Sequence, residues 1–108
     1  MNAAATTPTH AHRRQGETRI SIVLPAYNEA GNLERLVREI FAVVPEELVG
    51  EVIVVDDASD DGTAAETKAL IGGFPRLRYI RLATRCGQSA AVHTGVRAAR
   101  YGLIATLD

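Results

Sequence analysis

The side chains best suited to chemistry in this chain are carboxylates that directly follow apolar segments. Asp56 and Asp57 follow Val52–Val55, and Asp108 follows Ala105–Leu107. Buried strands rarely end in acidic residues unless those residues meet a ligand, a cation or a helix N-terminus. A carboxylate in such a place can accept hydrogen bonds from ribose hydroxyls or from a base N–H.

A second kind of contact is offered by the segment Pro25–Glu29. Tyr27 carries a flat ring on which a base can stack, and the Glu29 carboxylate can accept from base or ribose donors. The alternative is that Tyr27 is a partly buried core residue and that Glu29 is a favourable charge in a first helical turn. The segment lacks the glycines of a dinucleotide-binding or phosphate-binding loop, which argues against both kinds of site.

The acids of the second turn are expected to divide their roles. Asp56 and Asp57 are adjacent and point in different directions, so one can face a ligand while the other supports the turn. Their spacing does not indicate a metal site. For Asp60, Asp61 and Thr63 the favoured interpretation is capping of the next helix.

The third turn, Thr84–Ser89, contains Gly87, which allows a positive φ or a close backbone approach. Gln88 stands at a helix start, where it can hydrogen-bond a ligand or act only in capping. Cys86 is the single cysteine, which excludes an internal disulfide and fits a reducing, cytosolic setting. His93 is expected to be a packed or surface residue rather than a catalytic base.

Strand-like and helix-like segments alternate between residues 19 and 108, and this alternation predicts the elements that position these side chains. Short β-branched runs predict strands at 20–24, 52–55, 77–82 and 103–107, and amphipathic or alanine-rich runs predict helices at 33–44, 63–71 and 89–100. Asn28 or Asn32 is the expected cap of the first helix.

The alternation predicts an α/β fold, a parallel sheet with helices on its faces. The continuous apolar strands indicate burial on both sides. Ligands bind outside the carboxyl ends of such strands, so Pro25–Glu29, Asp56–Gly62 and Asp108 are expected to converge.

Length and charge narrow the classes of protein that fit. The chain has 108 residues and 46% apolar residues, enough for one small domain with a core. Its net charge of −1 argues against a nucleic-acid partner bound through bulk charge. Residues 67–107 hold seven bases and no acid. We favour solvated arginines there over a basic face for a phosphate-bearing ligand or an anionic membrane. Residues 1–18 are predicted to be a disordered polar tail.

Four motifs in order and spacing resemble those of family 2 glycosyltransferases, which have the GT-A fold. They are P-A-Y-N-E, V-V-D-D-A-S-D-D-G-T, C-G-Q-S-A-A-V-H-T-G and a strand ending in L-D. The resemblance is closest to the dolichyl- or polyprenyl-phosphate mannosyl- and glucosyltransferase group. It implies that residues 19–108 form the nucleotide-binding half of a Rossmann-like GT-A domain.

The resemblance also implies a donor, a metal and an acceptor. The donor would be a GDP- or UDP-sugar, held by Pro25, Tyr27, Glu29, Val55, Asp57, Gln88 and Asp108. Asp57 would accept from the base, and Asp56 would be structural. Asp108 matches the first acid of the D-x-D motif, which helps to hold Mg²⁺ or Mn²⁺ on the diphosphate. The acceptor would be a lipid phosphate, and the setting cytoplasmic or at the cytoplasmic face of a membrane.

The second acid of that motif and the acceptor-binding half would fall beyond Asp108. The chain is therefore expected to be a donor-binding half that is inactive and marginally stable alone. One alternative is a non-enzymatic truncated module that binds nucleotide weakly or not at all. A phosphoacceptor receiver domain needs its acid pair after the first strand, and a nicotinamide-binding domain needs a glycine loop, so both fit poorly.

Overall fold

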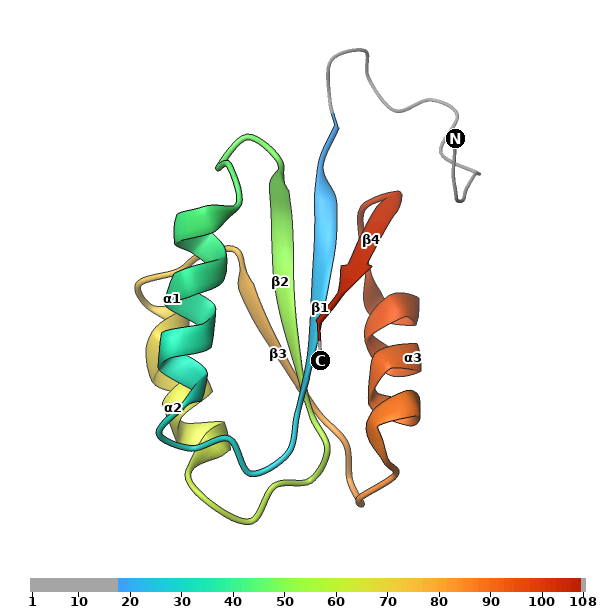
Figure 1. Cartoon of the computed structure of the whole chain (residues 1–108). Coiled ribbons are helices and arrows are strands. Elements are labelled where there is room, and N and C mark those ends of the chain that lie inside the picture. The colour runs from blue at the N-terminus through green and yellow to red at the C-terminus, as the bar shows by residue number, and fades with distance from the viewer. Residues whose placement is uncertain (1–17, 108) are drawn as a thin grey trace.

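The computed structural model describes residues 18–107 as a four-stranded parallel sheet with three helices (Figure 1). The elements are β1 Ile20–Ala26, α1 Leu33–Val43, β2 Val49–Asp56, α2 Thr63–Ile71, β3 Leu77–Arg81, α3 Gln88–Ala98 and β4 Leu103–Thr106. The predicted α/β alternation and the parallel sheet are confirmed. The predicted tail, apart from Thr18, and the predicted metal ligand Asp108 lie outside the described residues.

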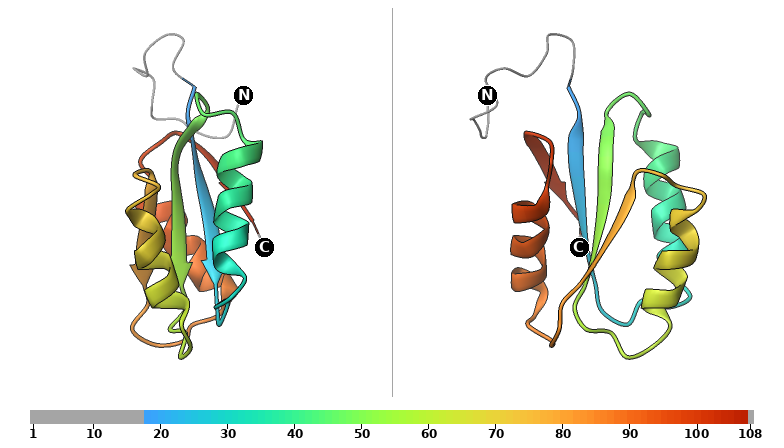
Figure 2. Two further views of the ribbon diagram at one scale, coloured as in Figure 1. Left: turned by 90° about the vertical axis from the view of Figure 1, so that its left-hand side faces the viewer. Right: turned by 180° about the vertical axis from the view of Figure 1, so that it is seen from behind.

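The helices cover opposite faces of the sheet, with α1 and α2 on one side and α3 on the other (Figures 1 and 2). Successive strand residues point to opposite faces, so each central strand supplies both cores. Ile22, Leu24, Val52 and Val54 pack under α1 and α2, whereas Val23, Ile53 and Val55 pack with Ala91 under α3.

The strand order is β3-β2-β1-β4, so the chain changes direction across the sheet at β1. The first two crossovers move outward from β1 to β3, and α3 then carries the chain to the other side of β1. In open parallel sheets such a switch point leaves a crevice at the carboxyl ends of the strands, where ligands bind. The topology therefore points to the carboxyl ends of β1 and β4, and the loop after β2 lies on the other side of β1.

Two predicted strand properties are wrong. β2 begins at Val49 rather than Val52, because the sheet accommodates both Gly50 and Glu51 within the strand. The Tyr101 ring lies where a side chain at Gly50 would be, and both carboxylate oxygens of buried Glu51 accept hydrogen bonds. β4 is half exposed rather than buried on both sides, because its only strand neighbour within residues 18–107 is β1. Among the same residues, no helix is both long and apolar enough to cross a membrane.

Close contact between α3 and the sheet depends on Gly95. A Cβ there would overlap the Val23 side chain and come within 3.1 Å of Val55. We expect Gly95→Ala to lower the free energy of unfolding by about 2 kcal/mol, because overpacking outweighs the gain of about 1 kcal/mol in helix propensity. Chemical denaturation measures this, with exposed Arg97→Ala on the same helix as the control. A Gly95→Ala protein as stable as wild type would contradict the prediction.

Candidate functional site

A pocket of about 170 Å³ lies where the ends of β1 and β2 meet the start of α3. Its lining consists of Pro25, Ala26, Tyr27, Glu29, Asp57, Arg85, Gln88 and Ala91. Five of the predicted site residues are therefore brought together, although they come from three separate loops. The volume is below the roughly 300–1,000 Å³ of typical ligand pockets, so these residues surround only part of a nucleotide-sized ligand.

The other two predicted residues do not line this pocket. Val55 is fully buried beneath α3, and its proposed contact with a nucleotide stays a prediction. Asp108 lies outside the described residues, so its predicted role also stays a prediction. The last described residue, Leu107, donates its N–H to the Val23 carbonyl oxygen at 2.9 Å, which keeps the end of β4 beside β1.

Asp57 holds the third loop, residues 82–87 between β3 and α3, at the end of β2. Its carboxylate is almost completely buried and accepts from the Cys86 N–H at 2.7 Å and from the Gly87 N–H at 2.8 Å. Gly87 has φ +99°, which explains the need for glycine there. Each carboxylate oxygen has a further lone pair with which it can accept from a ligand.

Arg85 is a pocket residue that the sequence reasoning missed. Its guanidinium carbon lies 3.6 Å from the centroid of the Tyr27 ring, and its Nε lies 3.6 Å from Asp57 Oδ2. The first contact has cation–π geometry. The only indication in the sequence was that residues 67–107 contain seven basic residues and no acid. That pattern did not distinguish Arg85 from the other arginines of the segment. A base can stack on this face of Tyr27 only after Arg85 moves away.

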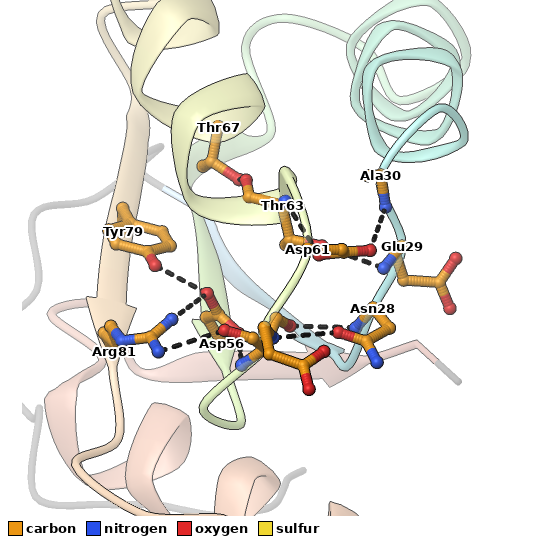
Figure 3. A network of polar contacts seen from close by, with 11 residues as sticks. Asn28, Glu29, Ala30, Asp56, Asp61, Thr63, Thr67, Tyr79 and Arg81 are labelled. Atoms are coloured by element: carbon orange, nitrogen blue, oxygen red, sulfur yellow. Dashed lines mark hydrogen bonds and ion pairs between the residues drawn. The ribbon is translucent and has the colours of Figure 1, made fainter.

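Asp56 supports the second turn from below. It is fully buried and accepts from the Ser59 N–H at 2.9 Å, the Tyr79 hydroxyl at 2.6 Å and Arg81 Nη1 at 3.1 Å (Figure 3). Burial alone raises the pKa of the Asp56 carboxyl, but the bonds from Ser59 and Tyr79 and the charge of Arg81 outweigh it and lower the pKa. The structure confirms the interpretation that Asp56 is structural.

Side chains of α2 and of the second loop, residues 57–62 after β2, hold the backbone of the first loop, residues 27–32 after β1 (Figure 3). Ser59 accepts from the Asn28 N–H at 2.8 Å, Thr63 from Glu29 at 2.9 Å, Asp61 from Ala30 at 3.2 Å, and Glu66 from Gly31 and Glu34 at 2.8 Å each. We call Ser59, Asp61, Thr63 and Glu66 the loop clamp. The clamp joins the two segments that carry Tyr27 and Asp57, so neither is positioned independently of the other.

The predicted capping roles are wrong or incomplete. Asn32 occupies the N-cap of α1, but its side chain donates to Glu29 and accepts from Arg35. The first turn of α1 is instead capped by Glu66 of α2. The N-cap of α2 is Gly62, although Asp61 does accept from the first helical amide at 2.9 Å.

The class of protein follows from the strand order, from the loops at the carboxyl ends of the strands, and from the solved structures that share this arrangement. The fold is that of the GT-A glycosyltransferases. Over 84% of this chain, residues 1–349 of TarS from S. aureus in complex with UDP-GlcNAc share the fold with a TM-score of 0.74 at 22% identity, and 26% of that chain is covered. The chain belongs to glycosyl transferase family 2, whose profile matches residues 21–108.

Relatives of higher identity include enzymes named for lipid phosphates. The chain is 37% identical over 92 residues to the dodecaprenyl-phosphate galacturonate synthase of Rhizobium johnstonii, covering 82% of this chain and 27% of that protein. It is 33% identical over 93 residues to the dolichol-phosphate mannosyltransferase of Pyrococcus furiosus, covering 83% of this chain and 25% of that protein.

A solved relative of comparable identity is the mannosyltransferase PcManGT from Pyrobaculum calidifontis in complex with GDP-Man and Mn²⁺. It matches with a TM-score of 0.67 and 32% identity over 76% of this chain and 24% of that one. The chain thus spans about a quarter of the relatives it matches, and it corresponds to their N-terminal part.

Within residues 18–107, no group of three or more His, Cys, Asp or Glu side chains is arranged to hold a metal ion. The Asp56 carboxylate accepts from Ser59 in its own loop and from Tyr79 and Arg81 of β3, and the Asp57 carboxylate accepts from two amides of the third loop.

Proposed function

We propose that this chain is the donor-binding part of a glycosyltransferase that transfers a sugar from a nucleoside-diphosphate sugar to a polyprenyl or dolichyl phosphate. The observation that carries the proposal is the convergence of Tyr27, Glu29 and Asp57 on one pocket at the carboxyl ends of the neighbouring strands β1 and β2. Family membership supports the reaction class, and the pocket supplies the chemistry of base and ribose recognition.

Each of these residues has a distinct role in the proposed complex. The Tyr27 ring stacks on the base once Arg85 has moved off it. Asp57 uses its remaining lone pairs to accept from a base N–H, and Glu29 accepts from ribose or base donors. Gln88, at the first position of α3, faces the same pocket and contacts the nucleotide sugar.

The proposed cofactor is Mg²⁺ or Mn²⁺, supported by the GDP-Man and Mn²⁺ complex of the 32% identical relative. Mg²⁺ commonly binds through one or two carboxylates together with substrate phosphates. Asp108 and the donor diphosphate are therefore the ligands that we propose. When bound, such a cation stabilises the charge on the departing diphosphate.

The proposed acceptor is a lipid phosphate, supported by two relatives whose names include dodecaprenyl phosphate and dolichol phosphate. The whole protein would then work at a membrane surface, on the cytoplasmic side. The exposed free thiol of Cys86 is compatible with a reducing compartment.

Calorimetric titration of the whole protein with GDP and UDP, each with and without Mn²⁺, tests the proposal. We expect metal-dependent binding of one of the two nucleotides, and transfer of sugar from the matching donor to a polyprenyl phosphate. Absence of binding to both nucleotides would reject the proposal. Binding without transfer to any lipid phosphate would favour the non-enzymatic module instead.

A further inference from the structure

We propose that Thr63 is a positioning residue for Glu29: its hydroxyl fixes the backbone on which Glu29 enters the nucleotide pocket. The inference rests on the proposed function, because it concerns how that same pocket is built. It also gives Asp61 and Thr63, interpreted from the sequence as caps of α2, a role in the site.

The hydroxyl of Thr63 has a defined direction. It donates to Asp61 Oδ1 at 2.6 Å and accepts from the Glu29 N–H at 2.9 Å (Figure 3). A hydroxyl has one proton, so the donation to Asp61 leaves only lone pairs to face the Glu29 amide. Because the acceptor is a carboxylate, this first bond is charge-assisted and short. Asp61 therefore orients Thr63, and Thr63 orients Glu29.

Thr63 acts on the pocket without touching a ligand in it. It is fully buried, whereas Glu29 lines the pocket. The residue before Glu29, Asn28, has φ +52°, a left-handed conformation that asparagine adopts more readily than most other residues. Ser59 and Thr63 accept from the amides of Asn28 and Glu29, and thereby hold this left-handed turn of the backbone. Loss of the Thr63 bond would let the backbone relax and carry Glu29 out of place.

Thr67 provides a matched control on the same helix. It is also fully buried, and its hydroxyl also makes a hydrogen bond, to the Thr63 carbonyl oxygen at 2.8 Å. That bond stays within α2 and does not reach the first loop. Thr63→Val and Thr67→Val therefore make the same chemical change at equal burial, and only the first removes a contact to Glu29.

The test measures affinity for GDP and UDP with Mn²⁺ by calorimetry, in the whole protein and its variants. We expect Thr63→Val to bind the preferred nucleotide about ten-fold more weakly, because small displacements of a binding group are costly. Thr63→Ser, which keeps the hydroxyl, and Thr67→Val should stay within about two-fold of wild type. Hydrogen exchange at the Glu29 amide should accelerate in Thr63→Val and not in Thr67→Val.

A double-mutant cycle separates positioning from a general loss of stability. If Thr63 acts through Glu29, Thr63→Val should have almost no further effect on affinity in a Glu29→Ala background. Should Thr63→Val fail to fold, Asp61→Ala at an exposed position removes the acceptor that orients the hydroxyl, and about three-fold weaker binding is expected.

The outcomes are distinguishable. Equal affinities of Thr63→Val and Thr67→Val, or additive effects of Thr63→Val and Glu29→Ala, would overturn the positioning role and leave the proposed function standing. If Thr63→Val does not fold, wild-type affinity of Asp61→Ala would overturn it as well. If wild type binds neither nucleotide, the proposed function fails and the positioning role fails with it.

Discussion

Replacing Glu51 with glutamine is expected to lower the free energy of unfolding by about 3 kcal/mol, the low end of the cost of breaking a buried ion pair. Glu51 is almost completely buried within β2. One carboxylate oxygen accepts from Ser21 and from the Arg100 N–H, each at 2.7 Å, and the other pairs with Arg78 at 2.6 Å. Glutamine keeps one oxygen only, so its amide would turn a donor toward one of these donors.

The loss of stability caused by Glu51→Gln should be smaller in acid than at neutral pH. Burial alone raises the pKa of the Glu51 carboxyl, but the bonds from Ser21, the Arg100 amide and Arg78 outweigh it and lower the pKa. A carboxyl whose pKa is lower in the folded state stabilises the fold above its unfolded pKa, and this stabilisation is lost as the pH falls through the folded pKa. The difference between wild type and Glu51→Gln should therefore be full at neutral pH and shrink in acid.

Urea denaturation across that pH range measures the effect, with exposed Glu47→Gln as the control of equal charge change. Replacing both Glu51 and Arg78 with apolar residues should recover part of the loss, because no buried charge is then left without a partner. A Glu51→Gln protein as stable as the control at neutral pH would show that this network contributes little.

Asp57→Asn is expected to weaken nucleotide binding at least about 100-fold, since it disturbs two parts of the site together. The carboxylate accepts from two consecutive amides of the third loop, Cys86 and Gly87. Asparagine has one acceptor oxygen, so one of these amides would face an N–H₂ group and the loop that carries Arg85 would shift. The proposed bond from Asp57 to the base would also lose its charge.

Two neighbouring acids serve as comparisons for Asp57. Asp60 is exposed, and Asp60→Asn should leave affinity unchanged. Asp56→Asn should lower stability by about 2–3 kcal/mol, because the fully buried acceptor of the bonds from Tyr79 and Arg81 loses its charge. Calorimetry with GDP and UDP gives affinity, and thermal denaturation gives stability. Near wild-type affinity of Asp57→Asn would exclude the proposed contact with the base.

The predicted C-terminal end of α3 is wrong, because tertiary contacts end the helix earlier than the local sequence indicates. The alanine-rich segment predicted a helix through Arg100, but α3 ends at Ala98. The next amides leave the helix because Arg100 donates to Glu51 and Tyr101 donates to the Ser21 hydroxyl. A buried carboxylate in β2 thus determines where α3 stops, and no local pattern near Arg100 indicates it.

In the candidate site, too, some residues could be identified from local sequence and others only from tertiary contacts. Tyr27, Glu29 and Asp57 were found because they stand where an apolar strand ends, and a parallel sheet brings such ends to one edge. The roles of Asp61 and Thr63 were interpreted from local capping rules alone. The structure adds their bonds to a loop more than 30 residues away. Arg85 could not be singled out, because several arginines of that segment have equivalent local surroundings.

The sequence by itself determined the alternation of strands and helices, the faces they bury and the strand ends that carry acids. These properties follow from local periodicity and from the cost of burying polar groups. Only the tertiary structure decided which buried acids support the fold, which loop holds which, and that Arg85 covers Tyr27. Those contacts join segments 27 to 58 residues apart, where chain geometry, and not residue order, selects the partner.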